Sequence, residues 1–182
     1  MRVVIAGGGT AGHVQPAVAL ARALEDEEVF FIGTVHGAEA QLIPKAQLPF
    51  STIDIEGFDR ARPLSLVALG PRAVRATMQA RAVLGERRPD VVVGMGGYVS
   101  LPVCVAARLR GTSIVLHEQN IVLGLANRVC RGSAARVAVS WGETLATAGR
   151  HGGVFTGNPV LPEIAHLDRL QRRPEALARF GL

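Results

Sequence analysis

The chain has 182 residues, of which 48% are hydrophobic and only 4% aromatic, and its formal net charge is +5. This length suits one well-packed domain with a short tail, and the apolar content excludes a disordered chain. No apolar run approaches the roughly 18 residues that span a bilayer. The N-terminal segment begins with a strand pattern and carries no cleavable leader, so we expect a cytoplasmic location.

Arginine supplies nearly all of the positive charge, because Lys45 is the only lysine among the 20 basic residues. An arginine-rich surface attracts nucleic acid, anionic lipid or a phosphorylated substrate. The arginines are not interleaved with stacking aromatics and no nucleic-acid-binding motif occurs, so nucleic acid is not an expected partner. Cys104 and Cys130 lack the spacing of metal ligands and are expected to be reduced thiols in helices around the core.

Short runs rich in valine and isoleucine alternate along the chain with longer segments of helical period. The expected strands are Arg2–Ala6, Val29–Ile32, Phe50–Ile55, Val91–Gly94, Ser113–His117, Arg136–Val139 and Val154–Thr156. The expected helices are Val14–Glu25, Ala38–Pro44, Leu64–Arg87, Val99–Arg110, Ala126–Cys130, a short one after Trp141, and Pro174–Phe180. This alternation predicts an α/β fold with a Rossmann-like parallel sheet that has helices on both faces.

A glycine-rich turn, Gly7-Gly8-Gly9-Thr10-Ala11-Gly12-His13, directly follows the first predicted strand. Glycines let the backbone approach a ligand closely, and a helix that begins after such a turn directs its free N–H groups at anions. The turn matches G-x-G-x-x-G, but a dinucleotide site also needs an acidic residue at the end of the second strand. That strand ends Phe31-Ile32-Gly33-Thr34, so the turn indicates a phosphate group rather than a dinucleotide cofactor.

His13 lies at the expected start of the first helix. The helix dipole disfavours the imidazolium form there, so a neutral ring can accept a proton near neutral pH. The alternative is a histidine that only caps the helix or packs against it. Its place beside a phosphate-type turn favours a role in the chemistry, and His13 is our candidate catalytic base.

Two further segments leave the predicted sheet at the same edge as the first turn. Gly94-Met95-Gly96-Gly97-Tyr98 follows the fourth strand, and His117-Glu118-Gln119-Asn120 follows the fifth. Ligands of such sheets bind at the carboxyl ends of the strands, so the three segments are expected to converge. The polar run suits recognition of a sugar or a peptide, and the alternative is a solvated turn. No carboxylate pairs with Glu118 and no D-x-D motif occurs, so neither a metal nor another cofactor is expected.

The segment Arg60–Arg88 interleaves apolar side chains with arginines. An apolar stripe beside a basic stripe can seat a helix on an anionic membrane, but the same pattern also fits a core-facing helix with a solvated arginine face. The candidate membrane patch consists of Leu66, Leu69, Arg72, Val74 and Arg75.

Together these motifs resemble the MurG family of peptidoglycan glycosyltransferases, in the same order and over essentially the whole chain. The matching residues are Gly8–His13 with Pro16, Gly94–Ser100 with Pro102, His117–Asn120 with Gly124 and Asn127, and Gly157–Val160. The resemblance implies the N-terminal half of a GT-B enzyme at the cytoplasmic face of the bacterial cell membrane. That enzyme transfers GlcNAc from UDP-GlcNAc, with inversion, to undecaprenyl-diphosphate-linked MurNAc-pentapeptide, which converts lipid I to lipid II. The cell-wall and division machinery are implied as further partners.

The resemblance also assigns roles to individual residues. The acceptor and its diphosphate are expected to contact Thr10, Gly12, Gly96, Gly97, Tyr98, His117, Glu118 and Asn120. UDP-GlcNAc is expected to contact Thr10, Ala11, Gly12, Asn120 and Asn127. Residues 1–160 are expected to form the acceptor-binding domain, and residues 161–182 are expected to form a linker toward a donor-binding domain. Without that donor-binding domain the chain is expected to be inactive.

The sequence departs from the family pattern at three places. Ala11 replaces a usual glycine, Leu161 replaces a usual arginine, and Val74 and Thr77 stand where bulky aromatics are frequent. These changes stiffen the first turn, remove one charged contact and weaken membrane anchoring. Two alternative functions stay open: another GT-B transferase with a polyprenyl-linked or lipid acceptor, and a non-catalytic membrane-associated binding module.

Overall fold

The computed structural model describes residues 1–57, 65–149 and 152–182, with residues 65–69 described by their backbone alone. In these ranges the sheet has seven strands, and every neighbouring pair is parallel. The strands are β1 (Arg2–Ala6), β2 (Glu28–Gly33), β3 (Phe50–Thr52), β4 (Val91–Gly94), β5 (Ser113–Glu118), β6 (Arg136–Val139) and β7 (Gly153–Phe155).

The strand order is β3-β2-β1-β4-β5-β6-β7, so the chain builds outward from β1 in one direction and then in the other. The order reverses between β1 and β4, which lie side by side with Ala6 opposite Gly94. In open parallel sheets such a reversal leaves a crevice at the carboxyl ends of the two strands, where ligands bind. The topology therefore places the site just beyond Ala6 and Gly94.

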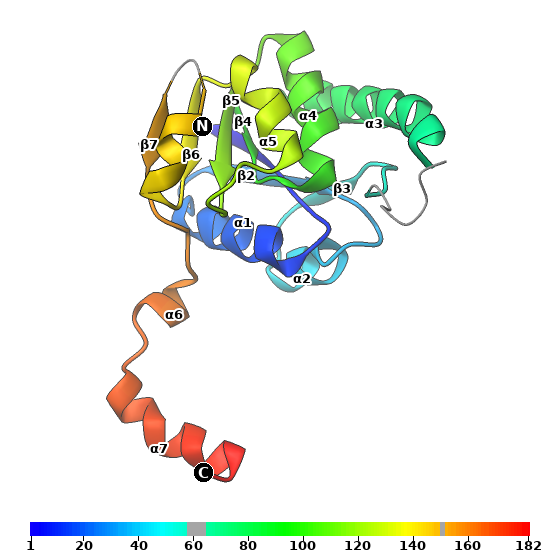
Figure 1. Ribbon diagram of the computed structural model, residues 1–182. Coiled ribbons are helices and arrows are strands. Elements are labelled where there is room, and N and C mark those ends of the chain that lie inside the picture. The colour runs from blue at the N-terminus through cyan, green and yellow to red at the C-terminus, as the bar shows by residue number, and fades with distance from the viewer. Residues whose placement is uncertain (58–64, 150–151) are drawn as a thin grey trace.

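Helices cover both faces of the sheet (Figure 1). Helices α1 (Ala11–Ala23) and α2 (Glu39–Lys45) lie on one face, and α3 (Ser65–Arg87), α4 (Gly97–Arg110) and α5 (Leu125–Cys130) lie on the other. Two short 3₁₀ helices, η1 (Arg131–Ser133) and η2 (Gly142–Thr147), complete the domain.

The core is divided between the two faces by the alternation of side chains along each strand. On β1, Val3 and Ile5 pack into the cluster beneath α1 and α2, while Val4 and Ala6 belong to the cluster beneath α3 and α4. Because both faces are covered, β1 is apolar along almost its whole length. This is why the strand appears in the sequence as a continuous valine and isoleucine run.

The predicted α/β fold is confirmed, and most predicted elements agree with the structure to within three residues. The third strand is shorter than predicted, because the chain leaves the sheet after Thr52 and continues as coil through the buried Ile53 and Ile55. The predicted first residue of the third helix, Leu64, lies outside the described residues. Cys104 and Cys130 are buried free thiols, as expected.

The C-terminal segment contains two helices, α6 (Pro162–Ala165) and α7 (Arg169–Phe180), of which the sequence predicted only the second half of α7. Helix α7 begins five residues before the predicted Pro174, because Asp168 caps it by accepting hydrogen bonds from the N–H groups of Leu170 and Gln171. Neither helix has a buried residue, and α7 extends away from the sheet (Figure 1). The domain boundary at residue 160 stays a prediction.

Candidate active site

The two glycine turns meet at the crevice between β1 and β4. Gly97 has φ +76°, and a Cβ atom added there would lie 2.4 Å from the carbonyl oxygen of Gly8. Gly9 has φ +92°, and its added Cβ would lie 2.9 Å from the ring of Tyr98. Only glycine adopts this backbone region without strain and allows so close an approach. The two turns, which the sequence predicts to converge, therefore pack directly against each other.

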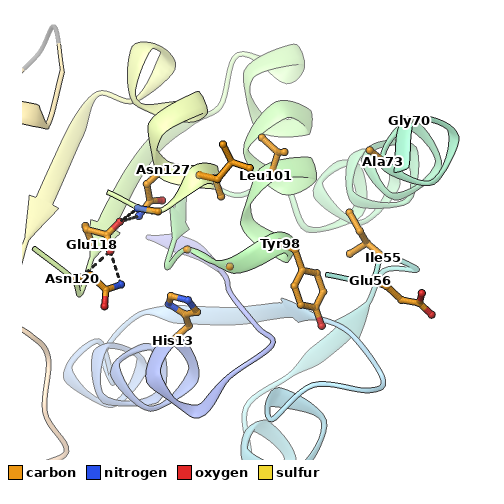
Figure 2. A pocket seen from close by; sticks show the side chains of 15 residues that line it. His13, Ile55, Glu56, Gly70, Ala73, Tyr98, Leu101, Glu118, Asn120 and Asn127 are labelled. Carbon is orange, nitrogen blue, oxygen red and sulfur yellow. Dashed lines mark hydrogen bonds between the residues drawn. The ribbon is translucent and has the colours of Figure 1, made fainter. Parts of the chain in front are cut away.

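A cavity of about 560 Å³ opens beside this contact. Figure 2 shows His13, Asn120 and Asn127 toward one end of the cavity and Ile55 and Ala73 toward α3 at the other. The full lining is His13, Ile55, Glu56, Gly70, Ala73, Gly96, Gly97, Tyr98, Leu101, Glu118, Asn120, Gly124, Leu125, Ala126 and Asn127. The cavity thus has a polar end beside the glycine turns and, beside α3, an end where the apolar Ile55 and Ala73 lie next to the carboxylate of Glu56.

Helix α4 begins at the polar end, and α1 reaches it at His13, its third residue. The N-cap residue of α4 is Gly96, which has no side chain, and the Thr10 side chain does not cap α1 by a hydrogen bond. The N–H groups in the first turn of a helix have no partner within the helix, and together with the helix dipole they favour a bound anion. The start of α4 at the polar end can therefore hold a negatively charged group, such as a diphosphate.

A buried carboxylate, Glu39, holds the first glycine turn in place. It accepts hydrogen bonds from Gly9 N at 2.9 Å, from Thr34 N at 3.0 Å and from Thr34 Oγ1 at 2.6 Å. The N–H group of Gly9 is therefore occupied within the protein, and a bound anion must use other donors. Glu39 is not among the site residues predicted from the sequence, although a single acidic residue that begins a short apolar helix is a usable signal.

Glu118 has a similar role in the loop after β5. Its Oε1 accepts from Asn120 N at 3.0 Å and Asn120 Nδ2 at 2.9 Å, and its Oε2 accepts from Gly124 N at 2.8 Å and Asn127 Nδ2 at 2.9 Å. The residue is only 1% exposed. Both oxygens are engaged with the protein's own donors, so Glu118 shapes the cavity wall rather than presenting a free carboxylate.

The two asparagines that contact Glu118 differ in exposure. Asn120 is exposed at the polar end of the cavity (Figure 2), so its amide is accessible to a ligand. Asn127 is 1% exposed and also donates to the carbonyl oxygen of His117 at 3.0 Å, while its Oδ1 has no donor among the described residues. Of the two, Asn120 is placed for direct contact with a ligand.

The side chain of Gln119 connects the two histidines of the site. The His13 Nδ1 atom lies 3.1 Å from Gln119 Oε1, and the His117 Nδ1 atom lies 3.1 Å from Gln119 Nε2. His117 is almost fully buried, with its Nε2 atom 3.2 Å from the carbonyl oxygen of Gly157. Burial lowers the pKa of His117, against the opposing effects of the Gly157 hydrogen bond and the Glu118 charge, and so favours the neutral ring.

Comparison with known proteins identifies the domain. Residues 3–139 match the model of the glycosyltransferase family 28 N-terminal domain. The chain belongs to glycosyltransferase family 28. All four motifs follow strands of the parallel sheet, so they lie at its carboxyl edge.

The relatives of this family 28 domain confirm its resemblance to the MurG family. A protein of a Nocardioides species, named UDP-N-acetylglucosamine–N-acetylmuramyl-(pentapeptide) pyrophosphoryl-undecaprenol N-acetylglucosamine transferase, is 46% identical over all of this chain and half of its own length. A protein of the same name from Halalkalibacterium halodurans is 41% identical, again over all of this chain and half of its own length. The crystal structure of Acinetobacter baumannii MurG superimposes with a TM-score of 0.73 and 30% identity, covering 86% of this chain and 45% of that one. The family 28 domain therefore spans about half the length of the curated relatives it matches.

The predicted site residues of the family 28 domain lie in three places: in the lining of the cavity, behind its wall, and at a separate hollow. The cavity lining includes His13, Gly96, Gly97, Tyr98, Glu118, Asn120 and Asn127. His117 lies behind this wall, and Gln119, absent from the predicted site, joins it to His13. Ala11 and Gly12 instead line a separate hollow of about 450 Å³ together with Asn158–Leu161, with Thr10 at the N-cap of α1 beside them. The ligand roles assigned to these residues stay predictions.

Two departures from the family pattern are neighbours in space. Ala11, at the first position of α1, and Leu161 line the same hollow, and Leu161 also packs against the core beneath α1. An arginine at position 161 would bring a positive charge to the anion-favouring start of α1. In this domain that position is apolar, so any anion there depends on the backbone N–H groups of α1.

The residues of the candidate membrane patch are only partly described, because the side chains of Leu66 and Leu69 lie outside the described residues. Arg72 forms an ion pair with Glu56 at 2.8 Å, and Arg75 forms one with Asp54 at 3.3 Å. Val74 is 65% exposed between them. On the opposite side of α3, the side chains Ala76, Ala80 and Leu84 are buried in the core. Helix α3 thus combines a core-facing side with an exposed apolar and arginine-bearing side.

Metal-binding clusters and membrane-spanning helices are both absent from the described residues. No three His, Cys, Asp or Glu side chains among them gather closely enough to hold a metal ion. In the same residues, no helix combines the length and the apolar character needed to cross a bilayer.

Proposed function

We propose that this domain is the acceptor-binding half of a transferase that moves GlcNAc from UDP-GlcNAc to undecaprenyl-diphosphate-linked MurNAc-pentapeptide, the step from lipid I to lipid II. The observation that carries the proposal is the cavity at the β1–β4 crevice. Its polar end has His13 and the uncapped start of α4, and its other end has the apolar side chains of Ile55 and Ala73 beside Glu56. An acceptor with a sugar, a diphosphate and a polyprenyl chain is likewise polar at one end and apolar at the other. The names of the relatives support this choice.

In the proposed reaction His13 is the general base. The muramyl 4-hydroxyl attacks the anomeric carbon of GlcNAc from the face opposite UDP, and its proton passes to a ring nitrogen of His13. The bond to UDP breaks and the electron pair leaves with the diphosphate, so the configuration inverts. We assign donor binding to the part of the relatives that this chain does not cover, and the proposal invokes no metal or other cofactor.

The acceptor diphosphate is placed at the contact between the two glycine turns. Gly96 and Gly97 bring the start of α4 against the start of α1, and His13 lies against both glycines. N–H groups oriented in advance stabilise negative charge without the cost of reorganising solvent. Tyr98, whose ring packs against Gly9 and Gly57, separates this polar end from Ile55.

A binding experiment on this 182-residue chain tests the proposal. A soluble, short-chain analogue of lipid I is expected to shift the amide NMR signals of Gly96, Gly97 and Tyr98. Free UDP-GlcNAc is expected to shift them little, because the domain holds no complete donor site in this proposal. A matched analogue without the diphosphate should bind much more weakly, since the start of α4 would lose its anion.

Three outcomes would contradict this assignment. Strong binding of UDP-GlcNAc in the same cavity would make it a donor site. Equal binding of an analogue with a different sugar would favour the alternative of a transferase for another polyprenyl-linked acceptor. Binding to vesicles without binding of any sugar diphosphate would favour the non-catalytic membrane module.

We also propose that α3 carries the membrane contact, at the cytoplasmic face of the cell membrane. The exposed Val74 and Met78 lie on a helix that also presents Arg72 and Arg75. Each basic side chain near an anionic surface contributes about 1 kcal/mol. The local ion pairs with Glu56 and Asp54 offset part of this attraction. Contact with the cell-wall and division machinery stays a prediction.

Charge reversal on α3 is expected to weaken binding to anionic vesicles. Arg72→Glu/Arg75→Glu should lower the partition coefficient by about tenfold or more in a sedimentation assay with phosphatidylglycerol vesicles, because attraction becomes repulsion. Arg136→Glu/Arg172→Glu, which changes the net charge equally on β6 and α7 away from α3 (Figure 1), is the matched control. If both variants bind alike, α3 is not the contact.

A further inference from the structure

The amide of Gln119 has an orientation that its surroundings determine. Its Nε2 atom lies 3.0 Å from the carbonyl oxygen of Met95, which can only accept a hydrogen bond. The nitrogen must therefore be on this side, and the oxygen must be on the side of His13. The second hydrogen of the same Nε2 points at His117 Nδ1, 3.1 Å away.

This orientation fixes the tautomer of both histidines. The Gln119 Oε1 atom can only accept, so His13 must carry its hydrogen on Nδ1, across a distance of 3.1 Å. His117 accepts at Nδ1 and donates from Nε2 to the carbonyl oxygen of Gly157. A neutral His13 then has its only free lone pair on Nε2, the atom that is able to take up a proton.

The backbone of Gln119 is itself held from a separate part of the chain. The indole Nε1 of Trp141 donates to the carbonyl oxygen of Gln119 at 3.0 Å. Two positions further, Thr144 Oγ1 donates to the carbonyl oxygen of Ile121 at 2.8 Å. The amide therefore reaches His13 from a loop whose backbone is held at Gln119 and at Ile121.

We propose that Gln119 is a positioning residue that keeps the proton of neutral His13 on Nδ1 and leaves Nε2 as the proton acceptor. This inference rests on the proposed function, in which His13 is the base. After Nε2 takes up a proton, the Nδ1 hydrogen still faces Gln119 Oε1. The ring needs no rearrangement between its two states, which is what a base in a preorganised site requires.

The tautomer is measurable on this chain without any activity. In ¹⁵N-labelled protein, long-range ¹H–¹⁵N correlations distinguish a protonated Nδ1 from a protonated Nε2. For neutral His13 we expect the hydrogen on Nδ1, and for His117 the hydrogen on Nε2. The opposite assignment for His13 in the unmodified chain would overturn the proposal, even if no variant folds.

Gln119→Leu removes the acceptor while keeping a side chain of similar size. In this variant the His13 hydrogen is expected to move largely to Nε2, the form that histidine prefers in water. Gln119→Glu keeps an acceptor toward His13 and should keep the hydrogen on Nδ1, although it loses the donor to Met95. Gln41→Leu, an exposed glutamine on α2, is the matched control and should leave both tautomers unchanged. An unchanged His13 in Gln119→Leu would contradict the positioning role.

The same variants in a transferase that carries this domain separate the inference from the proposed function. Gln119→Leu should lower kcat by about 10- to 100-fold with a smaller effect on KM, because a ring in the wrong tautomer cannot accept the proton. If the tautomer shifts as expected but kcat does not fall, Gln119 positions His13 and His13 is not the base. If the tautomer does not shift, the inference fails whatever the role of His13.

Discussion

Replacing His13 with alanine in a transferase that carries this domain is expected to lower kcat by about 10²- to 10⁴-fold, the usual contribution of a general base. The reason is geometric as well as chemical, because His13 lies between the two glycine turns at the polar end of the cavity. KM for the acceptor should change much less, since most of the cavity wall stays intact. Steady-state kinetics with a soluble lipid I analogue measures both constants.

The control for this experiment is His166→Ala, which removes an exposed histidine that follows α6. Its kcat should stay within twofold of the unmodified enzyme. A loss below about tenfold in His13→Ala would be too small for a general base and would reduce His13 to a binding or packing residue. Circular dichroism of both variants checks that the fold is unchanged.

Replacing Glu118 with alanine is expected to lower the free energy of unfolding of this chain by about 3–5 kcal/mol. The carboxylate accepts four hydrogen bonds, and its loss leaves the N–H groups of Asn120, Gly124 and Asn127 without their acceptor. A donor buried without a partner costs about 1–3 kcal/mol, although Asn120 is near enough to solvent to recover part of this. Urea denaturation followed by circular dichroism measures the change.

Two further variants identify the cause of this loss. Glu118→Gln keeps the size of the side chain but directs an NH₂ group at two donors, so it should still be clearly destabilised. Glu143→Ala removes an exposed carboxylate from η2 and should change stability by less than about 0.5 kcal/mol. A change below 1 kcal/mol in Glu118→Ala would show that the hydrogen bonds to Glu118 contribute little to folding, and would restore it as a candidate ligand contact.

The sequence predicted the fold and the location of the site for a reason that applies to all parallel sheets. Alternating strand and helix patterns specify such a sheet, and turns after different strands all lie at its carboxyl edge. The glycines after β1 and β4 are therefore expected to lie together at this edge. Their contact, with Gly97 against the Gly8 carbonyl, explains why glycine occupies both turns.

The direction of each polar side chain was decided only by the tertiary structure. His117, Glu118, Gln119 and Asn120 appear in the sequence as one polar run, yet Glu118 is buried on four donors while Gln119 bridges to His13. The contact between Gln119 and His13 joins residues 106 positions apart. Local patterns contain no information about which long-range partner a side chain meets. The sequence alone thus determined the fold class, the edge that carries the site and His13 as its candidate base, whereas packing between distant segments decided which residues hold that base.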